Sequence, residues 1–324
     1  MDFNFLFGVG TDKLCLKMSD LLFLYNYLLD KYKVRRLTEM DSSITIVTAF
    51  FDIGRGNWTA NKGFSPHLER TPETYIDYFK NLSTLDNEMI IFTSYDLKPA
   101  IEKIRAGKKT TVVTFDINTK FTAIRQKIHD IQKDDAFRNR LETRQLINPE
   151  YWSAEYVLVC NLKAYFINKA LEMNLVNNEM VAWIDFGYCR NPEVTNGLSL
   201  WNYPFDKRKV NLFTVKRGLN PKSIDHVFEH MINNRSYIIG GAIVATQEKW
   251  QAFYKLVRRC QIKTLRNKIV DDDQGIFIMC HYLNPELTKL NYLGKNRWFY
   301  LFKMYGKKDL KSRLLRLKVL LRGK

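Results

Sequence analysis

The sequence predicts an α/β protein with a mostly parallel central sheet flanked by helices. From Ser43 onwards, runs of β-branched and aromatic residues alternate with helical segments, which is typical of parallel strands joined by crossover helices. The apolar run Val181–Ile184 ends at the single carboxylate of Asp185, and open α/β sheets bind their ligands at such strand ends. The chain has 324 residues, of which 46% are hydrophobic, so it can bury a large core.

The first half predicts a regular series of elements. Strands are expected at 44–51, 89–93, 110–115 and 181–184. Helices are expected at 72–82, 97–106, 120–145 and 156–173. Thr71 is a suitable N-cap for the first of these helices, and Pro72 is a suitable first helical residue.

The second half is less regular. A strand is expected at 237–244, with Gly240 and Gly241 in its middle, and helices are expected at 247–268 and from 274 to 281. Paired glycines let the backbone approach a ligand closely, but they also occur at bulges and tight strand crossings. Both interpretations stay open for this pair.

The composition points to anionic partners in a reducing compartment. The net charge of +17 favours nucleic acid, an anionic membrane or phosphorylated substrates. The five cysteines have no metal-type spacing and are expected to be free thiols. A secretory signal peptide is not expected, and no apolar run approaches the ~20 residues needed for a transmembrane helix.

The chain is expected to have three parts. Residues 1–42 are predicted to be a helical appendage, and residues 43–305 the main domain. Residues 306–324 are predicted to form a basic amphipathic tail. Its apolar stripe consists of leucines spaced by four, three and four residues, namely Leu310, Leu314, Leu317 and Leu321. Such a helix binds an anionic membrane surface or packs on the domain through its leucines.

Two acidic positions suggest metal-assisted handling of a phosphate-bearing substrate. Asp185 lies beside Gly187, which adds no side-chain bulk near a metal–diphosphate, although an Asp at a strand end also caps turns. Asp272 and Asp273 begin a predicted helix, where the helix dipole alone favours acids. Like charges in this stretch also repel, and a bound cation or basic substrate would relieve that repulsion.

The loop Asp52–Trp58 follows the first predicted strand. Backbone amides near Gly54 and Gly56, together with Arg55, are a candidate phosphate cradle. The loop lacks the Gly-Lys-Ser/Thr of a P-loop, so an ordinary surface loop is the favoured interpretation.

Several of these segments resemble the HtrL/YibB family of bacterial proteins. The resemblance covers roughly residues 44–305 and rests on four stretches: Ile46–Gly56, Met89–Ser94, Trp183–Tyr188 and Asp272–Gln274. Members are associated with lipopolysaccharide and surface-glycan gene clusters and look like GT-A glycosyltransferases. The resemblance implies a GT-A-like fold with a nucleotide-sugar-binding half at 43–190 and an acceptor-binding half at 191–305.

The resemblance also implies roles for particular residues. Asp272 or Asp273 is expected to be the catalytic base or to orient the acceptor. The expected donor-binding residues are Thr48, Phe51, Arg55, Asp116, Lys163, Gly187, Gly240 and Gly241. For Lys163, however, an exposed helix position is the favoured interpretation.

A divalent metal, Mn²⁺ or Mg²⁺, is the expected cofactor under this resemblance. Asp185 would stand where GT-A enzymes carry their Asp-x-Asp metal motif, but Gly187 replaces the second acid. The metal is then one protein ligand short. Either another residue supplies that ligand, with His281 and Asn291 as candidates, or the ion is held mainly by diphosphate and water.

The favoured function is a metal-dependent glycosyltransferase that moves a sugar from a nucleotide-diphosphate donor, most simply a UDP-sugar, to a lipopolysaccharide or surface-glycan acceptor. The expected location is cytoplasmic, at the inner face of the cytoplasmic membrane, with residues 306–324 on the anionic surface. No specific nucleic acid is expected. Two alternatives stay open: a nucleic-acid-binding protein that uses its basic surface, and an inactive glycosyltransferase-like accessory protein, which the loss of the second acid at Gly187 favours.

Overall fold

The computed structural model describes residues 43–307 and 309–321. The helical appendage predicted for residues 1–42 lies outside the described residues. No helix in the described ranges is long and apolar enough to cross a membrane.

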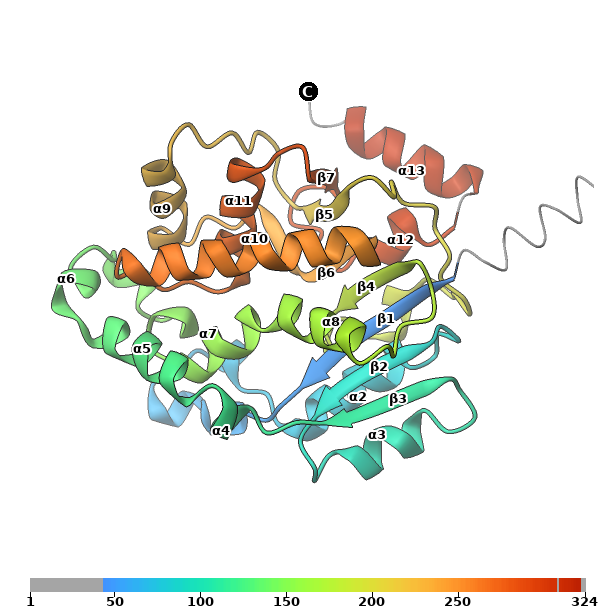
Figure 1. The fold of residues 1–324 in the computed structure, drawn as a ribbon, viewed down its shortest axis with the longest axis horizontal. Coiled ribbons are helices and arrows are strands. Elements are labelled where there is room, and N and C mark those ends of the chain that lie inside the picture. Colours follow the sequence, from blue (N-terminus) through green and yellow to red (C-terminus); the bar gives the residue numbers. More distant parts are fainter. Residues whose placement is uncertain (1–42, 308, 322–324) are drawn as a thin grey trace, which may run out of the picture. The chain divides into compact units, whose positions relative to one another are not determined.

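The described part of the chain is built on one seven-stranded sheet (Figure 1). Its strands are β1 (Ile44–Phe50), β2 (Met89–Thr93), β3 (Thr110–Thr114), β4 (Met180–Ile184), β5 (Val210–Thr214), β6 (Ile238–Thr246) and β7 (Thr288–Tyr292). Their order is β3-β2-β1-β4-β6-β5-β7. All neighbouring strands are parallel except β6, which runs antiparallel to both β4 and β5. The predicted α/β class with a mostly parallel sheet is therefore confirmed.

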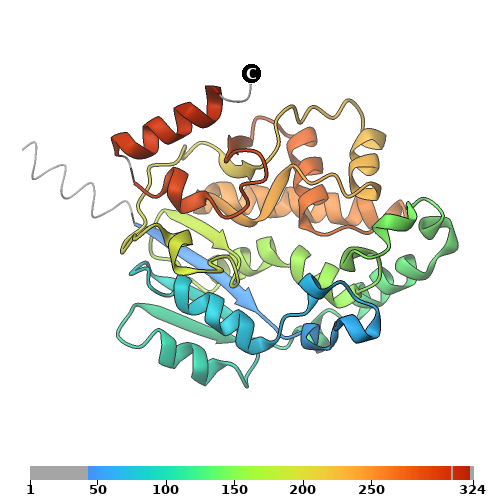
Figure 2. The ribbon, with the colours of Figure 1, turned by 180° about the vertical axis from the view of Figure 1, so that it is seen from behind.

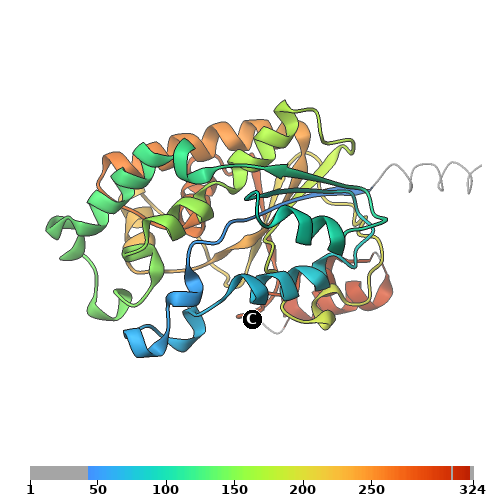
Figure 3. The same cartoon turned by 90° about the horizontal axis from the view of Figure 1, so that it is seen from below.

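Helices cover both faces of this sheet. The face visible in Figure 1 carries α5 (Thr122–Lys133), α7 (Ala154–Asn161), α8 (Lys163–Glu172), α10 (Gln247–Arg266) and α11 (Asp273–Leu283), with the short α4 (Ile117–Lys120) and α6 (Asp135–Arg138) and α9 (Ile224–Ile232) beside them. The opposite face carries α2 (Pro72–Leu82), α3 (Lys98–Ile104) and α12 (Leu301–Tyr305), as Figure 2 shows. Figure 3 shows the sheet between these two layers.

The side-chain alternation of the strands builds a separate core on each face. In β1 and β4, Val47 and Trp183 belong to the core under α8 and α10, whereas Ile46 and Ala182 belong to the core under α2. These residues are at most 3% exposed, because parallel strands covered on both faces bury both sets of side chains.

Several local predictions hold at the level of single residues. Thr71 caps α2, because its hydroxyl accepts a hydrogen bond from the Thr74 backbone N–H at 3.3 Å, and Pro72 is the first helical residue. The single helix predicted over 156–173 is wrong in one respect, since the structure breaks it at Leu162 into α7 and α8. The break makes Lys163 the first residue of α8, at the edge of a cavity.

The predicted basic tail contains one helix, α13 (Leu310–Leu321). Val319 is buried, and its carbonyl oxygen accepts a 2.9 Å hydrogen bond from Arg217 Nη2. Leu314 and Leu317 are 46% and 50% exposed, so at least these two leucines of the predicted stripe face away from the domain. The side chains of Leu310 and Leu321 lie outside what the structure describes.

Candidate functional site

A cavity of about 440 Å³ opens where β1 and β4 lie side by side. The chain leaves β1 outwards to β2 and β3, and then returns to β4 on the other side of β1. This is a topological switch point, the place where open α/β sheets bind ligands. The volume is within the range of small-molecule sites, about 300–1,000 Å³.

Most of the predicted site residues line this cavity. They are Phe51, Arg55, Lys163, Asp185, Gly187, Gly240, Gly241, Asp272 and Asp273. The loop after β1, the loop after β4, the middle of β6 and the first turns of α8 and α11 supply them. Segments as far apart in the chain as β1 and α11 thus meet at one edge of the sheet.

The ammonium of Lys163 lies between two carboxylates. Its Nζ is 2.9 Å from Asp185 Oδ1 and 2.5 Å from Asp273 Oδ2, and it donates a 2.9 Å hydrogen bond to the carbonyl oxygen of Gly240. Only 8% of the Lys163 side chain is exposed, so the favoured expectation of an exposed helix lysine is wrong. The sequence of α8 could not indicate this burial, because both acids come from other elements.

Charge balance makes the buried ammonium stable. Burial by itself lowers the pKa of Lys163, but the charges of Asp185 and Asp273 outweigh burial and raise that pKa above its ordinary value. Lys163 is therefore a cation at neutral pH. Burial raises the pKa of Asp273 to about 7, although the charge of Lys163 opposes this shift.

The two glycines of β6 leave room for these acids. A Cβ atom at Gly240 would lie 2.1 Å from Asp273 Oδ2, and one at Gly241 would lie 2.9 Å from the Tyr188 ring and 3.5 Å from Asp185 Oδ2. The missing side chains thus allow α11 and the loop after β4 to approach the sheet closely.

Asp272 is the second acid of the α11 turn and the best placed to exchange a proton. Its Oδ1 accepts a 2.8 Å hydrogen bond from the Gln274 backbone N–H, which caps α11. Burial and the nearby Glu150 raise the pKa of Asp272 to about 7, although its hydrogen bonds and Lys163 oppose that shift. A carboxyl group with such a pKa can accept or release a proton at neutral pH.

Three arginines contribute positive charge to the other wall of the cavity. Arg55 is 6% exposed. Its guanidinium donates to the carbonyl oxygen of Leu68 from Nε at 3.2 Å and from Nη2 at 3.0 Å, and it also donates to the Tyr75 hydroxyl. Arg70 and Arg190 also line the cavity. Burial lowers the pKa of Arg190, and the charges of Arg70 and Arg55 lower it further. This mutual repulsion favours a bound anion.

Aromatic rings form much of the remaining wall. Tyr156 lies beside Arg55, whose guanidinium carbon is 5.8 Å from its ring centroid. Trp298 and Phe299 also line the cavity, and Phe299 stacks under Arg190 at 4.5 Å. Trp298 and Phe299 are only partly buried. Such rings can stack on a nucleobase or a sugar.

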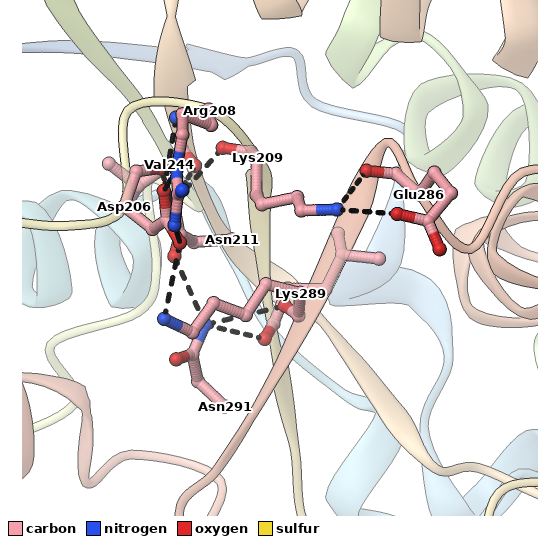
Figure 4. A network of polar contacts seen from close by, with 9 residues as sticks. Asp206, Arg208, Lys209, Asn211, Val244, Glu286, Lys289 and Asn291 are labelled. Carbon is pink, nitrogen blue, oxygen red and sulfur yellow. Dashed lines mark hydrogen bonds and ion pairs between the residues drawn. The ribbon is translucent and has the colours of Figure 1, made fainter.

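Four predicted site residues lie elsewhere. Thr48 is buried in β1, and Asp116 caps α4 by accepting hydrogen bonds from the backbone N–H groups of Asn118 and Thr119. His281 contacts the Thr288 hydroxyl at 2.7 Å. Asn291 belongs to β7, and its side-chain amide donates to the carbonyl oxygen of Leu212 in β5 at 3.3 Å (Figure 4). None of the four lines the cavity.

The donors around Asp185 do not fit a divalent metal. Asp185 Oδ1 accepts a 2.7 Å hydrogen bond from Trp183 Nε1 in addition to its contact with Lys163. Within residues 43–307 and 309–321, no three His, Cys, Asp or Glu side chains are grouped so that they could hold a metal ion. A divalent ion held mainly by protein side chains needs more oxygen or nitrogen ligands than this arrangement offers.

Sequence reasoning missed Arg70, Arg190 and Gln274 as cavity residues. Arg190 comes five residues after Asp185, so its place beyond a ligand-binding strand end was a usable signal. Arg70 carries no such signal, because it reaches the cavity through the irregular segment between β1 and α2.

Comparison with known proteins gives a structural neighbour, a relative in sequence and a matching family. The apo form of mouse xyloside xylosyltransferase 1 aligns with 82% of this chain and 94% of its own, at 10% identity and a TM-score of 0.37. Protein HtrL of Escherichia coli (strain K12) is 59% identical over 285 residues, which cover 88% of this chain and all of the relative. The family described as "Bacterial protein of unknown function (HtrL_YibB)" matches residues 42–307. The chain therefore belongs to the HtrL/YibB family of bacterial proteins.

Proposed function

We propose that this protein is a glycosyltransferase that moves a sugar from a nucleotide-diphosphate donor to a bacterial surface-glycan acceptor. The observation that carries the proposal is the composition of one cavity at the switch point of the sheet. A proton-accepting acid, Asp272, and two guanidinium groups, those of Arg70 and Arg190, line the same space. Membership of the HtrL/YibB family, whose members look like GT-A glycosyltransferases, supports the same reaction class.

The chemistry assigns different tasks to the two walls. Arg70 and Arg190 bind the diphosphate of the donor through charge-assisted hydrogen bonds, and aromatic rings such as Tyr156 stack on the nucleoside or the sugar. The acceptor hydroxyl enters beside Asp272. As the acceptor oxygen forms a bond with the anomeric carbon, its proton passes to Asp272, and the bond from the anomeric carbon to the diphosphate breaks. The nucleoside diphosphate leaves with the bonding electron pair.

Asp272 suits the role of base better than Asp273 does. Asp273 is 2.5 Å from the Lys163 ammonium, which stabilises its ionised form and lowers its tendency to take up a proton. The pKa values of both acids are about 7, so the difference between them lies in their contacts. Asp272 forms no ion pair within 4.0 Å in the described part of the chain, so no ammonium competes for the proton that it would accept.

The first experiment measures melting temperature with a panel of nucleoside diphosphates and their sugars. A ligand at about 100 times its dissociation constant adds ~2.7 kcal/mol to the free energy of unfolding, which gives a clear increase in melting temperature. We expect one nucleotide series, UDP most simply, to stabilise the protein. A folded protein that responds to none of them would contradict the proposal.

The second experiment measures release of the nucleoside diphosphate with lipopolysaccharide core oligosaccharide as acceptor. Asp272→Asn should lower kcat by about 10²–10⁴-fold with little change in donor binding, because it removes the base and keeps the shape. Asp77→Asn is the matched control, since Asp77 is 67% exposed and does not line the cavity. Equal activity in the two variants would remove Asp272 from the mechanism.

A further inference from the structure

The ammonium of Lys163 contacts both acidic positions of the site, Asp185 and Asp273. An ammonium has three N–H donors, and Lys163 has three groups of acceptors around it: the carboxylates of Asp185 and Asp273 and the carbonyl oxygen of Gly240. All of these contacts are 2.9 Å or shorter at their closest. The donor capacity of the ammonium is therefore used within the protein.

A divalent cation would compete with this ammonium for the same oxygens. To bind both Asp185 and Asp273, the ion would have to displace Lys163, whose side chain is 8% exposed. Leaving the ammonium in place would put two cations side by side in a poorly solvated site, where like charges repel strongly. Trp183 Nε1 also points at Asp185 Oδ1, and an N–H donor cannot share that direction with a cation.

In a transferase site of this kind, a metal would also bind the phosphates of the donor. Arg70 and Arg190 line the cavity and can bind those phosphates instead. Arg190 lies 4.5 Å from the Phe299 ring centroid and 5.9 Å from that of Tyr78, so aromatic faces support its guanidinium. In the part of the chain that the structure describes, neither Arg190 nor Arg70 forms an ion pair with a carboxylate within 4.0 Å. Both guanidinium groups line the cavity with donors available for an anion.

We propose that Lys163 is a positioning residue that takes the place of the divalent cation between Asp185 and Asp273, and that Arg70 and Arg190 bind the donor's diphosphate, so that the site works without a metal. The identity of the anion as a diphosphate rests on the proposed function. The replacement of the cation by Lys163 rests on the contacts of Lys163 alone.

The first test measures Mn²⁺ binding by the chelator-treated full-length protein, followed by the loss of the free Mn²⁺ signal in electron paramagnetic resonance. We expect no saturable binding by the wild type. Lys163→Met has a similar volume and frees both carboxylates, so it should gain a Mn²⁺ site, and Asp273→Asn in the same chain should remove that site again. A merely structural lysine would not produce such a gain.

The wild-type measurement decides the matter if Lys163→Met does not fold. Saturable Mn²⁺ binding by the wild type that disappears in Asp185→Asn would overturn the proposal, because Asp185 would then be a metal ligand. Failure of Lys163→Met to bind Mn²⁺ while folded would also overturn it.

The second test uses UDP as the probe and compares its binding in EDTA with its binding in Mn²⁺. We expect equal affinity in both conditions. Arg190→Ala should weaken UDP binding by about tenfold or more, because it removes a charge-assisted contact. Arg208→Ala is the control, since Arg208 is 85% exposed, pairs with Asp206 and lies outside the cavity (Figure 4).

The two tests separate this inference from the proposed function. UDP binding that requires Mn²⁺ would overturn the metal-free site and leave the transferase proposal intact. A chain that binds no nucleotide in either condition would contradict the proposed function, while the Mn²⁺ measurement would still decide what Lys163 does.

Discussion

At the scale of single residues, the site depends on the absence of a side chain at Gly240. A Cβ atom there would lie 2.1 Å from Asp273 Oδ2, a separation that non-bonded atoms do not tolerate. Asp273 would have to move, and its contact with Lys163 would be lost. Gly240→Ala should therefore lower the free energy of unfolding by about 1–3 kcal/mol and abolish nucleotide binding.

Chemical denaturation and UDP titration check this prediction. Gly56→Ala is the matched control, because a Cβ at Gly56 would meet Thr71 at 3.4 Å, an ordinary contact. If Gly240→Ala matched Gly56→Ala in both measurements, Asp273 could not be packed against β6 as described.

A second residue-scale prediction concerns pH and the buried Glu150. Burial raises the pKa of Glu150 from 4.5 to about 7, and the acids Asp271 and Asp272 lie close to it. Between these two values the unfolded chain loses a proton that the folded chain keeps, so the free energy of unfolding falls as pH rises through this window. Above about pH 7 the folded chain has also lost the proton, so the free energy of unfolding does not fall further through this group.

Glu150→Gln removes the titration but can keep the hydrogen bond that Asn234 Nδ2 donates at 2.5 Å. The variant should be more stable than the wild type by about 1–3 kcal/mol at alkaline pH, and this gain should shrink towards pH 5. Urea denaturation across this range measures the difference. A gain that does not depend on pH would show that Glu150 titrates normally.

The sequence predicted the acids of the site better than their partner. Asp185, Asp272 and Asp273 could be identified because each lies at the end of a strand or the start of a helix, which is a local signal. The burial of Lys163 could not, because its two carboxylate partners lie 22 and 110 positions away in the chain. Only the folded sheet brings these three residues together.

At the scale of elements, α13 presents an apolar pair to solvent. Arg217 and Val319 attach the helix to the domain, while Leu314 and Leu317 are about half exposed on a strongly basic segment. We therefore propose that this face binds an anionic membrane surface, as the sequence predicts.

Co-sedimentation with vesicles that contain phosphatidylglycerol tests this proposal. Leu314→Glu combined with Leu317→Glu should lower vesicle binding by about tenfold or more, because it removes apolar burial and adds repulsion. Leu200→Glu is the control, since Leu200 is 41% exposed and lies outside α13. If the double variant bound vesicles as well as Leu200→Glu does, the leucine pair would not contact the membrane.

The elements that the sequence predicted are the ones with strong local patterns. β2 occupies the predicted residues, and β1 and β3 each end one residue early. β5 and β7 were not predicted, because β5 carries Asn211 among its apolar residues and β7 mixes Lys289 and Asn291 with its own. β5 pairs with β6 and with β7, and this pairing, which makes the two segments strands, has no local signal.

At the scale of the whole molecule, the place of the site follows from the connectivity of the sheet. The rule that ligands bind at a switch point predicts a cavity beside the ends of β1 and β4, and the cavity is there. The positive wall was less predictable, because the net charge of +17 does not indicate which few cations line a cavity.

The antiparallel strand β6 also has a consequence for how the chain is synthesised. β4 lies between β1 and β6, and its five residues are all buried. A nascent chain emerges from the ribosome in order, so β4 must wait about fifty residues for β6 to be translated, a delay of several seconds at 5–20 residues per second. During that delay β4 is an apolar edge with free backbone groups, and such an edge recruits chaperones or pairs with a neighbouring copy.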